Sequence, residues 1–102
     1  MAKLESKFQK ELIDKIRDQY PGCVILKNDS SYIQGFPDWT ILYKDKWVVL
    51  EAKRSKNATR QPNQEYYVDK LNDMSFSRFV YPENSDDVLE EISKYFNEGW
   101  GR

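Results

Sequence analysis

Two carboxylates and a lysine stand at strand-like spacing in the middle of the chain. Asp38 follows a Gly-Phe-Pro segment, and Glu51 and Lys53 flank Ala52 after twelve intervening residues. The residues around Glu51 are apolar enough for a strand buried on both faces, where a charge needs a partner or a metal. Magnesium prefers oxygen ligands and removes the repulsion between two carboxylates. Such a site could activate water and polarise a phosphoryl oxygen, with Lys53 stabilising negative charge.

A structural ion pair is the competing interpretation of the same residues. Lys53 could simply neutralise Glu51 or Asp38, and strand geometry alone favours neither interpretation over the other. A Glu-x-Lys triplet is also common in a chain with 32% charged residues, and Glu5-Ser6-Lys7 is a second example. The Pro-Asp pair upstream, at strand spacing, makes the instance at Glu51 informative.

A β-hairpin has to bring these groups together. A two-residue turn at Asp45-Lys46 would place Asp38 opposite Lys53, with Glu51 diagonal to Asp38, and would pair Lys44 with Trp47. All three functional side chains would then share one face. A three-residue turn would send Asp38 to the other face, so the prediction requires an even-length turn.

Hydrophobic periodicity and turn residues predict the elements around this hairpin. The expected order is α-β-β-β-α-β-α, with elements at 3–20, 23–27 (a buried strand), 36–43, 47–53, 63–74, 76–81 and 85–97. We expect Tyr67, Leu71 and Met74 on the inner stripe of the second helix, and Ser85 as the cap of the last helix. This pattern predicts an α/β fold in a single domain, 1–102.

Composition excludes several kinds of chemistry. The 102 residues include no histidine and only Cys23, so an internal disulfide, the common zinc sites and histidine-based catalysis are unavailable. No apolar run approaches the roughly 20 residues that span a bilayer, and no signal peptide is recognisable, so we expect a cytoplasmic protein. The net charge of -1 hides an uneven distribution, with basic residues concentrated at 44–60 and acidic residues at 83–91.

The motif Gly35-Phe36-Pro37-Asp38 with Glu51-Ala52-Lys53 resembles the PD-(D/E)XK nuclease superfamily. Within that superfamily, the chain looks most like the compact VRR-NUC type of phages and bacteria. The resemblance implies a restriction endonuclease-like α-β-β-β-α-β core, with a mixed central sheet flanked by helices and an extra C-terminal helix. It also implies that Asp38 and Glu51 hold magnesium or manganese, that the Ala52 carbonyl adds a ligand, and that Lys53 is the catalytic lysine.

Two helical positions extend the resemblance. The VRR-NUC type has a glutamine at the start of the second helix, seven residues before a core leucine. Gln64 is seven residues before Leu71 and matches this position, and Gln61 is the alternative glutamine. The family also has a glutamate in its first helix. Glu5 is centred on the apolar stripe of this helix whereas Glu11 falls off it, so we expect Glu5 to be the metal ligand, although an exposed acid favoured by the helix dipole is an ordinary alternative.

The resemblance implies a DNA endonuclease acting on branched DNA such as a Holliday junction. We expect nucleic-acid contacts from Lys27, Tyr32, Gln34, Arg54, Lys56 and Arg60. Cutting two strands symmetrically calls for a homodimer, and aromatic residues such as Trp39, Trp47, Trp100, Tyr66 and Tyr67 could form its interface. The alternatives are a catalytically inactive DNA-binding or interaction module and an RNA-processing nuclease.

Overall fold

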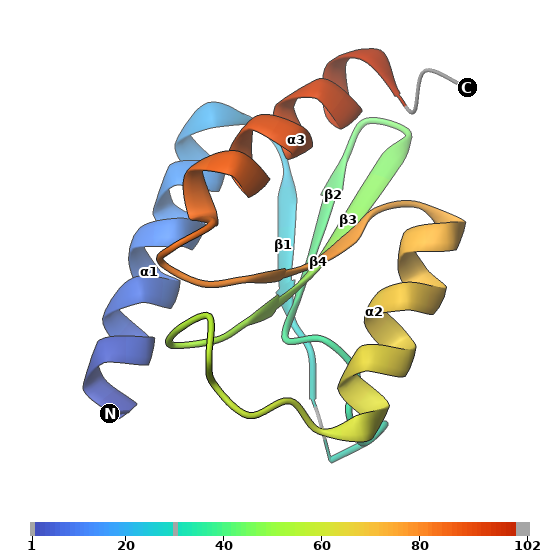
Figure 1. Ribbon diagram of the computed structural model, residues 1–102. Helices are drawn as coiled ribbons and strands as arrows, with labels where there is room; N and C mark the ends of the chain where they lie inside the picture. Colours follow the sequence, from blue (N-terminus) through green and yellow to red (C-terminus); the bar gives the residue numbers. More distant parts are fainter. Residues whose placement is uncertain (1, 30, 100–102) are drawn as a thin grey trace.

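Three helices and four strands make up the fold (Figure 1). The computed structural model describes residues 2–29 and 31–99, with side chains from residue 6 onward. The elements are α1 (Ala2–Gln19), β1 (Val24–Lys27), β2 (Trp39–Tyr43), β3 (Lys46–Ala52), α2 (Pro62–Met74), β4 (Ser77–Val80) and α3 (Ser85–Glu98). Their order is the one that the sequence predicted, and the α/β class is confirmed. No helix in the described part of the chain has the length and apolar character needed to cross a membrane.

The strands form one mixed sheet in the order β1-β2-β3-β4. The first three are antiparallel neighbours, whereas β4 lies parallel to β3 and pairs Val49 with Ser77. A parallel neighbour requires a crossover, and α2 provides it. The crossover carries the chain from the end of β3, where Glu51 and Lys53 lie, into the N-terminus of α2.

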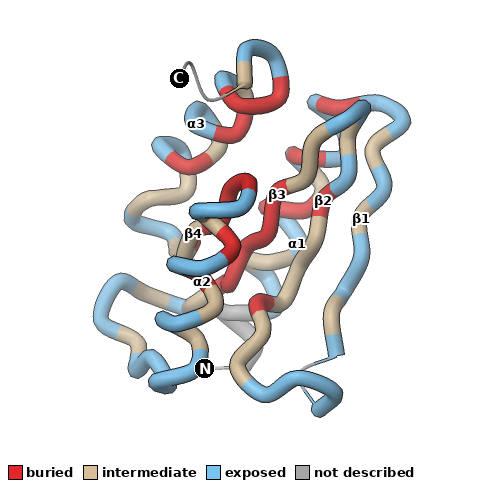
Figure 2. The backbone as a smooth tube through the Cα atoms, turned by 90° about the vertical axis from the view of Figure 1, so that its right-hand side faces the viewer, coloured by how far each residue is buried: buried red, intermediate tan, exposed pale blue. Residues whose placement is uncertain are grey.

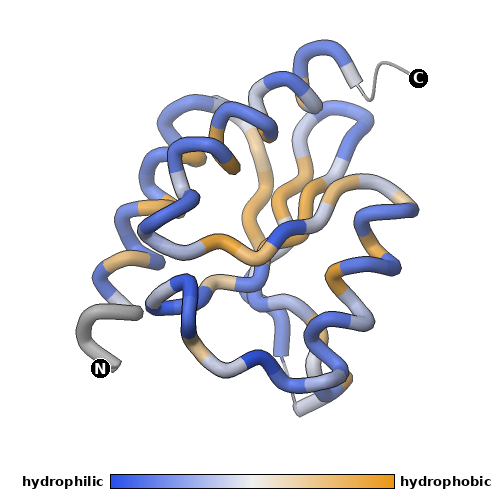
Figure 3. The backbone as a smooth tube through the Cα atoms, in the orientation of Figure 1, coloured by the Kyte–Doolittle hydropathy of each residue, from blue (hydrophilic) through white to orange (hydrophobic). Residues whose placement is uncertain are grey.

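The main core lies between the sheet and the helices α1 and α3 (Figure 1). The central strands are the most apolar part of the chain (Figure 3). Alternate residues of β3 point into this core and the others point toward α2, which covers the opposite face with Val68 and Leu71. The buried cluster comprises Leu12, Ile16, Tyr20, Ile41, Val48, Leu50, Ala52, Phe76, Val80, Val88, Ile92, Tyr95 and Phe96.

Strand β1 is an edge strand, not the buried strand that its composition predicted. Val24 and Leu26 are 49% and 46% exposed, and Figure 2 shows β1 at the margin of the sheet. The helix α2 packs over β3 and β4, which leaves the same face of β1 uncovered. Apolar β-branched composition alone therefore did not distinguish an edge strand from a central strand.

Two predictions about helix ends are also wrong. Met74 is 65% exposed, because α2 turns Val68 and Leu71 toward the sheet instead. The N-cap of α3 is Asn84 rather than Ser85, which is the first residue of that helix. The Asn84 side chain accepts a hydrogen bond from the Tyr81 backbone N–H at 2.9 Å and so ties the turn to the preceding strand. Asp86 and Asp87 lie in the first turn of α3, where the helix dipole favours acidic side chains.

The hairpin turn has the predicted even length but a different position. Tyr43 pairs with Lys46, so the two turn residues are Lys44 and Asp45 rather than Asp45 and Lys46. Lys44 has a φ of 57°, in the left-handed region that favours glycine. The ring of Tyr43 lies 5.3 Å from that of Phe96, centroid to centroid, so the end of β2 packs against α3.

The orientation of α2 generates a stability prediction. We expect Leu71→Ala to lower the free energy of unfolding by about 2–4 kcal/mol, because it leaves a cavity above the sheet. Met74→Ala is the matched control on the same helix and should cost less than about 0.5 kcal/mol, because its side chain is exposed. Urea denaturation measures both values. Equal losses would contradict this orientation of the helix.

Candidate active site

Asp38 and Glu51 face each other where β2 begins and β3 ends. Trp39 pairs with Leu50, so the same register, continued by one residue, sets Asp38 opposite Glu51. The sequence had placed Asp38 opposite Lys53; the shifted turn moves this pairing by two residues but keeps the three side chains on one face. The backbone N–H of Asn28 donates to the Asp38 carbonyl at 2.7 Å and extends the ladder from β1 to this point.

Glu51 is the one buried carboxylate among the residues whose side chains are described: the residue is 4% exposed. Burial, followed by the negative charge of Asp38, raises the pKa of Glu51 to about 8, and a hydrogen bond with Asp38 adds to this shift. Lys53 and Lys27 act in the opposite direction but do not cancel it. In the absence of a bound cation, Glu51 therefore carries a proton at neutral pH.

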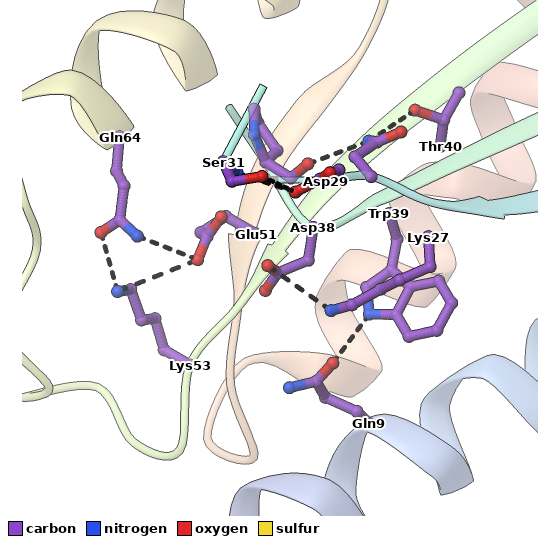
Figure 4. A network of polar contacts seen from close by, with 12 residues as sticks. Gln9, Lys27, Asp29, Ser31, Asp38, Trp39, Thr40, Glu51, Lys53 and Gln64 are labelled. Atoms are coloured by element: carbon purple, nitrogen blue, oxygen red, sulfur yellow. Dashed lines mark hydrogen bonds and ion pairs between the residues drawn. The ribbon is translucent and has the colours of Figure 1, made fainter. Parts of the chain in front are cut away.

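Gln64 links Glu51 to Lys53 from the first turn of α2 (Figure 4). Its side-chain oxygen accepts a hydrogen bond from Lys53 Nζ at 2.8 Å, and its Nε2 donates to Glu51 Oε2 at 3.2 Å. The Gln61 backbone N–H donates to the same oxygen of Gln64 at 2.9 Å, which holds the amide in one orientation. Of the two glutamines that the sequence offered, Gln64 reaches the predicted residues and Gln61 caps the helix.

Lys53 is held on several sides. Its side chain is 13% exposed, its ammonium lies 3.9 Å from Glu51 Oε2, and it donates to the Thr59 carbonyl at 3.1 Å. With the bond to Gln64, two of its three N–H groups have acceptors in the described structure. The third can donate to a group that enters the site.

A second set of residues, Lys27, Trp39 and Gln9, lies on the side of Asp38 away from Lys53 and Gln64 (Figure 4). The sequence analysis had not assigned these residues a role in positioning Asp38. Lys27 Nζ lies 3.6 Å from Asp38 Oδ1 and 4.7 Å from the centroid of the Trp39 ring (Figure 4). The Trp39 indole N–H donates to Gln9 Oε1 at 2.8 Å, which connects the strand to α1. No motif marks this contact, because it joins residues 30 positions apart that only the packing of α1 brings together.

The loop before Asp38 is fixed at both ends. The Asn28 side chain donates to the Pro37 carbonyl and to Thr40 Oγ1, both at 2.9 Å. Gly35 has a φ of +85° and packs directly on Asn63, so any Cβ at this position would overlap α2. The predicted Gly-Phe-Pro-Asp motif therefore works partly through its glycine, which lets the loop approach the helix that carries Gln64.

The remaining predicted metal ligands have different outcomes. Ala52 lies in β3 between Glu51 and Lys53 and pairs with Val80, and the role of its carbonyl as a ligand stays a prediction. The Glu5 side chain lies outside the described part of the structure, although its backbone belongs to α1 one turn before Gln9. Glu11, the competitor, is exposed and lines a separate cavity with Lys15 and Leu89.

The predicted nucleic-acid contacts lie in different local environments. Tyr32 is 86% exposed, and Gln34 lines a cavity of about 270 Å³ together with Gln61 and Gln64. The Lys56 backbone N–H donates to Glu83 Oε1, and the Arg60 guanidinium stacks 4.0 Å from the centroid of the Phe79 ring. Arg54 is exposed on the loop that follows Lys53. Lys27 is the member of this set closest to Asp38.

The donor set suits a hard cation bound through a small number of protein ligands. No cluster of three or more acidic, cysteine or histidine side chains occurs in the described residues, which leave out the Glu5 side chain, and the carboxylates described at the site are those of Asp38 and Glu51. Magnesium commonly binds through one or two carboxylates and retains several waters. Asp38, Glu51 and the adjacent backbone carbonyl of Ala52 fit that mode of binding.

The chain was compared with protein-family models, with characterised proteins and with solved structures, and none of the three comparisons gave a match. The chemistry of the site therefore rests on the geometry and electrostatics of its own residues.

The raised pKa of Glu51 generates a prediction for metal-free protein. Between its ordinary value of 4.5 and about 8, folded Glu51 keeps a proton that the unfolded chain has lost. Stability should therefore fall by about 1.4 kcal/mol per pH unit across this window and level off above it. Glu51→Gln should remove this slope.

Urea denaturation in EDTA at pH 5, 6, 7 and 8 measures the effect. Glu90→Gln, an exposed substitution on α3, is the matched control and should retain the slope. Parallel curves for wild type and Glu51→Gln would contradict the assignment of the proton to Glu51.

Proposed function

We propose that the protein is a magnesium-dependent nuclease that hydrolyses phosphodiester bonds in DNA. The observation that carries this proposal is the convergence of Asp38, buried Glu51, Lys53 and Gln64 at one end of the sheet. Asp38 and Glu51 would hold the cation. When bound, magnesium supplies Lewis acidity toward a phosphoryl oxygen and lowers the pKa of a coordinated water.

The electrostatics favour a metal site over a structural ion pair. In a satisfied ion pair, the lysine would stabilise the ionised carboxylate and lower its pKa. The pKa of Glu51 is instead raised, to about 8, although Lys53 lies 3.9 Å away and Lys27 also acts on it. The two lysines therefore do not fully neutralise the negative charge of Asp38 and Glu51. A bound divalent cation would neutralise the rest.

Lys53 and Gln64 would act on the reacting groups in different ways. Gln64 holds the ammonium of Lys53 and the carboxyl group of Glu51 in a fixed relation. The remaining N–H of Lys53 would donate to the attacking water or to the phosphoryl oxygen that gains charge in the transition state. Gln64 is then a positioning residue, and its effect on the reaction passes through its two partners.

The resemblance to PD-(D/E)XK nucleases of the VRR-NUC type supports the same proposal. A mixed sheet with three antiparallel strands, a crossover helix and a parallel fourth strand is compatible with the core that this resemblance implies. On that basis, we propose branched DNA as the substrate and a homodimer as the form that cuts two strands. Of the aromatic residues suggested for a dimer interface, Tyr66 is 57% exposed, whereas Trp39 and Trp47 are partly buried.

An inactive DNA-binding module is the second candidate. The contacts of Asp38 with Lys27 and of Glu51 with Gln64 favour it, because they hold the two carboxyl groups in place without a metal. An RNA-processing nuclease would use the same chemistry. Replacing the DNA substrate with RNA distinguishes the RNA-processing nuclease from the DNA nuclease.

Cleavage of a labelled four-way DNA junction tests the proposed activity. Wild type should cut with Mg²⁺ and not with EDTA, and Asp38→Asn and Lys53→Met should each reduce the rate by about 100-fold or more, because each removes charge from the reacting centre. Asp45→Asn and Lys70→Met are matched changes at exposed positions and should leave the rate unchanged. Cutting by Asp38→Asn at the wild-type rate would refute the site, and the same assay with RNA tests the third candidate.

Metal binding should also displace the proton of Glu51. Below pH 8, each bound Mg²⁺ should release about one proton, so its dissociation constant should rise about tenfold for each unit by which the pH falls. Calorimetric titration in two buffers with different ionisation enthalpies measures this release. A dissociation constant that is the same at pH 6 and pH 8 would contradict the proposal that Glu51 is a ligand.

A further inference from the structure

A groove lies along α1 next to the candidate active site. Its volume is about 480 Å³, and residues of α1 at helical spacing form one wall while the ends of β1 and β2 form the other. Lining residues used below are Gln9, Lys10, Ile13, Arg17, Lys27 and Trp39. This volume is within the range of small-ligand pockets, so the groove suits a narrow occupant such as one nucleic-acid strand.

The groove is positively charged although the chain has a net charge of -1. Lys10, Arg17 and Lys27 line it, and Asp14 is the one carboxylate among its lining residues. Asp14 lies between the first two, 2.9 Å from Lys10 Nζ and 3.3 Å from Arg17. Because the side chains of Lys10 and Arg17 are 78% and 59% exposed, these ion pairs are weak and can exchange for phosphate contacts.

The floor of the groove is rigid and partly apolar. Ile13 is 5% exposed, and Trp39 is anchored by its hydrogen bond to Gln9. Lys27 covers the Trp39 ring, and its ammonium points toward the Asp38 carboxylate (Figure 4). Lys27 therefore borders both the groove and the candidate metal site.

The spacing of the cations matches a phosphate backbone. Lys10 and Arg17 are two helical turns apart, about 10.5 Å along the axis of α1. This separation lets the two side chains reach different phosphates of one strand, so each can make its own phosphate contact. Lys27 would contact the phosphate nearest the site, and cation binding at Asp38 would release Lys27 for that contact.

We propose that this groove binds a single DNA strand that extends from the candidate active site, through phosphate contacts of Lys10, Arg17 and Lys27. The link to catalysis rests on the proposed nuclease function, whereas strand binding does not. The groove lies on the Asp38 side of the site, opposite Lys53 and Gln64 (Figure 4). The strand would therefore cross the site from the α2 side to the α1 side.

Binding of a fluorescein-labelled 12-nucleotide oligothymidylate in EDTA tests the groove without any cleavage. Lys10→Ala combined with Arg17→Ala should weaken binding about tenfold or more at low salt. It should also reduce the slope of log K against log salt by about 1.4, because two phosphate contacts are lost. The matched control combines Lys70→Ala and Lys94→Ala, which remove the same charge from exposed positions on α2 and α3.

A gain-of-binding variant provides an independent measurement. Asp14→Asn removes the carboxylate that competes for Lys10 and Arg17, so it should strengthen binding about threefold, whereas Asp45→Asn at the hairpin turn should have no such effect. In a Trp47→Phe, Trp100→Phe background, Trp39 is the remaining tryptophan, and its emission should change when the oligonucleotide binds.

The outcomes separate the groove from the nuclease. The proposal of strand binding in the groove would be overturned if the two double variants weakened oligonucleotide binding equally. It would also be overturned if the wild type did not bind the oligonucleotide at low salt. The Lys10→Ala, Arg17→Ala double variant could also bind the oligonucleotide as tightly as the wild type and cut junctions at the wild-type rate. That result would support the nuclease function and reject strand binding in the groove. Groove-dependent binding without any magnesium-dependent cleavage would support the groove and reject the nuclease.

Discussion

The burial of Glu51 beside Asp38 constrains everything around it. A carboxylate in an apolar strand is costly unless its charge is neutralised, and a second carboxylate across the ladder adds to the cost. The surrounding elements reduce this cost in three ways: a proton on Glu51, a lysine near each carboxylate, and an amide from α2 that donates to Glu51. The crossover from β3 to α2 brings the Gln64 amide to Glu51, so the geometry of the site depends on the topology of the sheet.

The sequence predicted the elements well because the signals behind them are local. Helical periodicity, the Pro21-Gly22 turn after the first helix and the alternation of residues in the hairpin all depend on neighbouring residues. These local signals were sufficient to predict the order of elements. The shared face of Asp38, Glu51 and Lys53 was also predictable, since it depends only on whether the turn length is even or odd. Exposure was harder to predict: Val24 and Leu26 look like core residues in sequence, and their exposure follows from which strands α2 covers.

The register of the hairpin and the contacts of Asp38 could not be predicted in the same way. The polar run at 44–46 allows two positions for a two-residue turn, at 44–45 or at 45–46, and both keep Tyr43 in the strand, so the local sequence does not distinguish them. The contact between Gln9 and Trp39 likewise requires α1 to be docked on the sheet. Gln64 was an exception, because the family resemblance supplied a long-range relation that single-sequence patterns lack.

The two-residue turn restricts how the length of this segment can change. One residue inserted or deleted within the paired segments between Asp38 and Glu51 would rotate one strand by half its repeat and separate the carboxylates onto opposite faces. Two residues added symmetrically about Lys44-Asp45 would lengthen the hairpin and preserve their pairing. The loop at 29–37 lies before both carboxylates and is free of this restriction. Length variation compatible with the site is therefore expected to be even in the hairpin and unrestricted in parity in the loop before it.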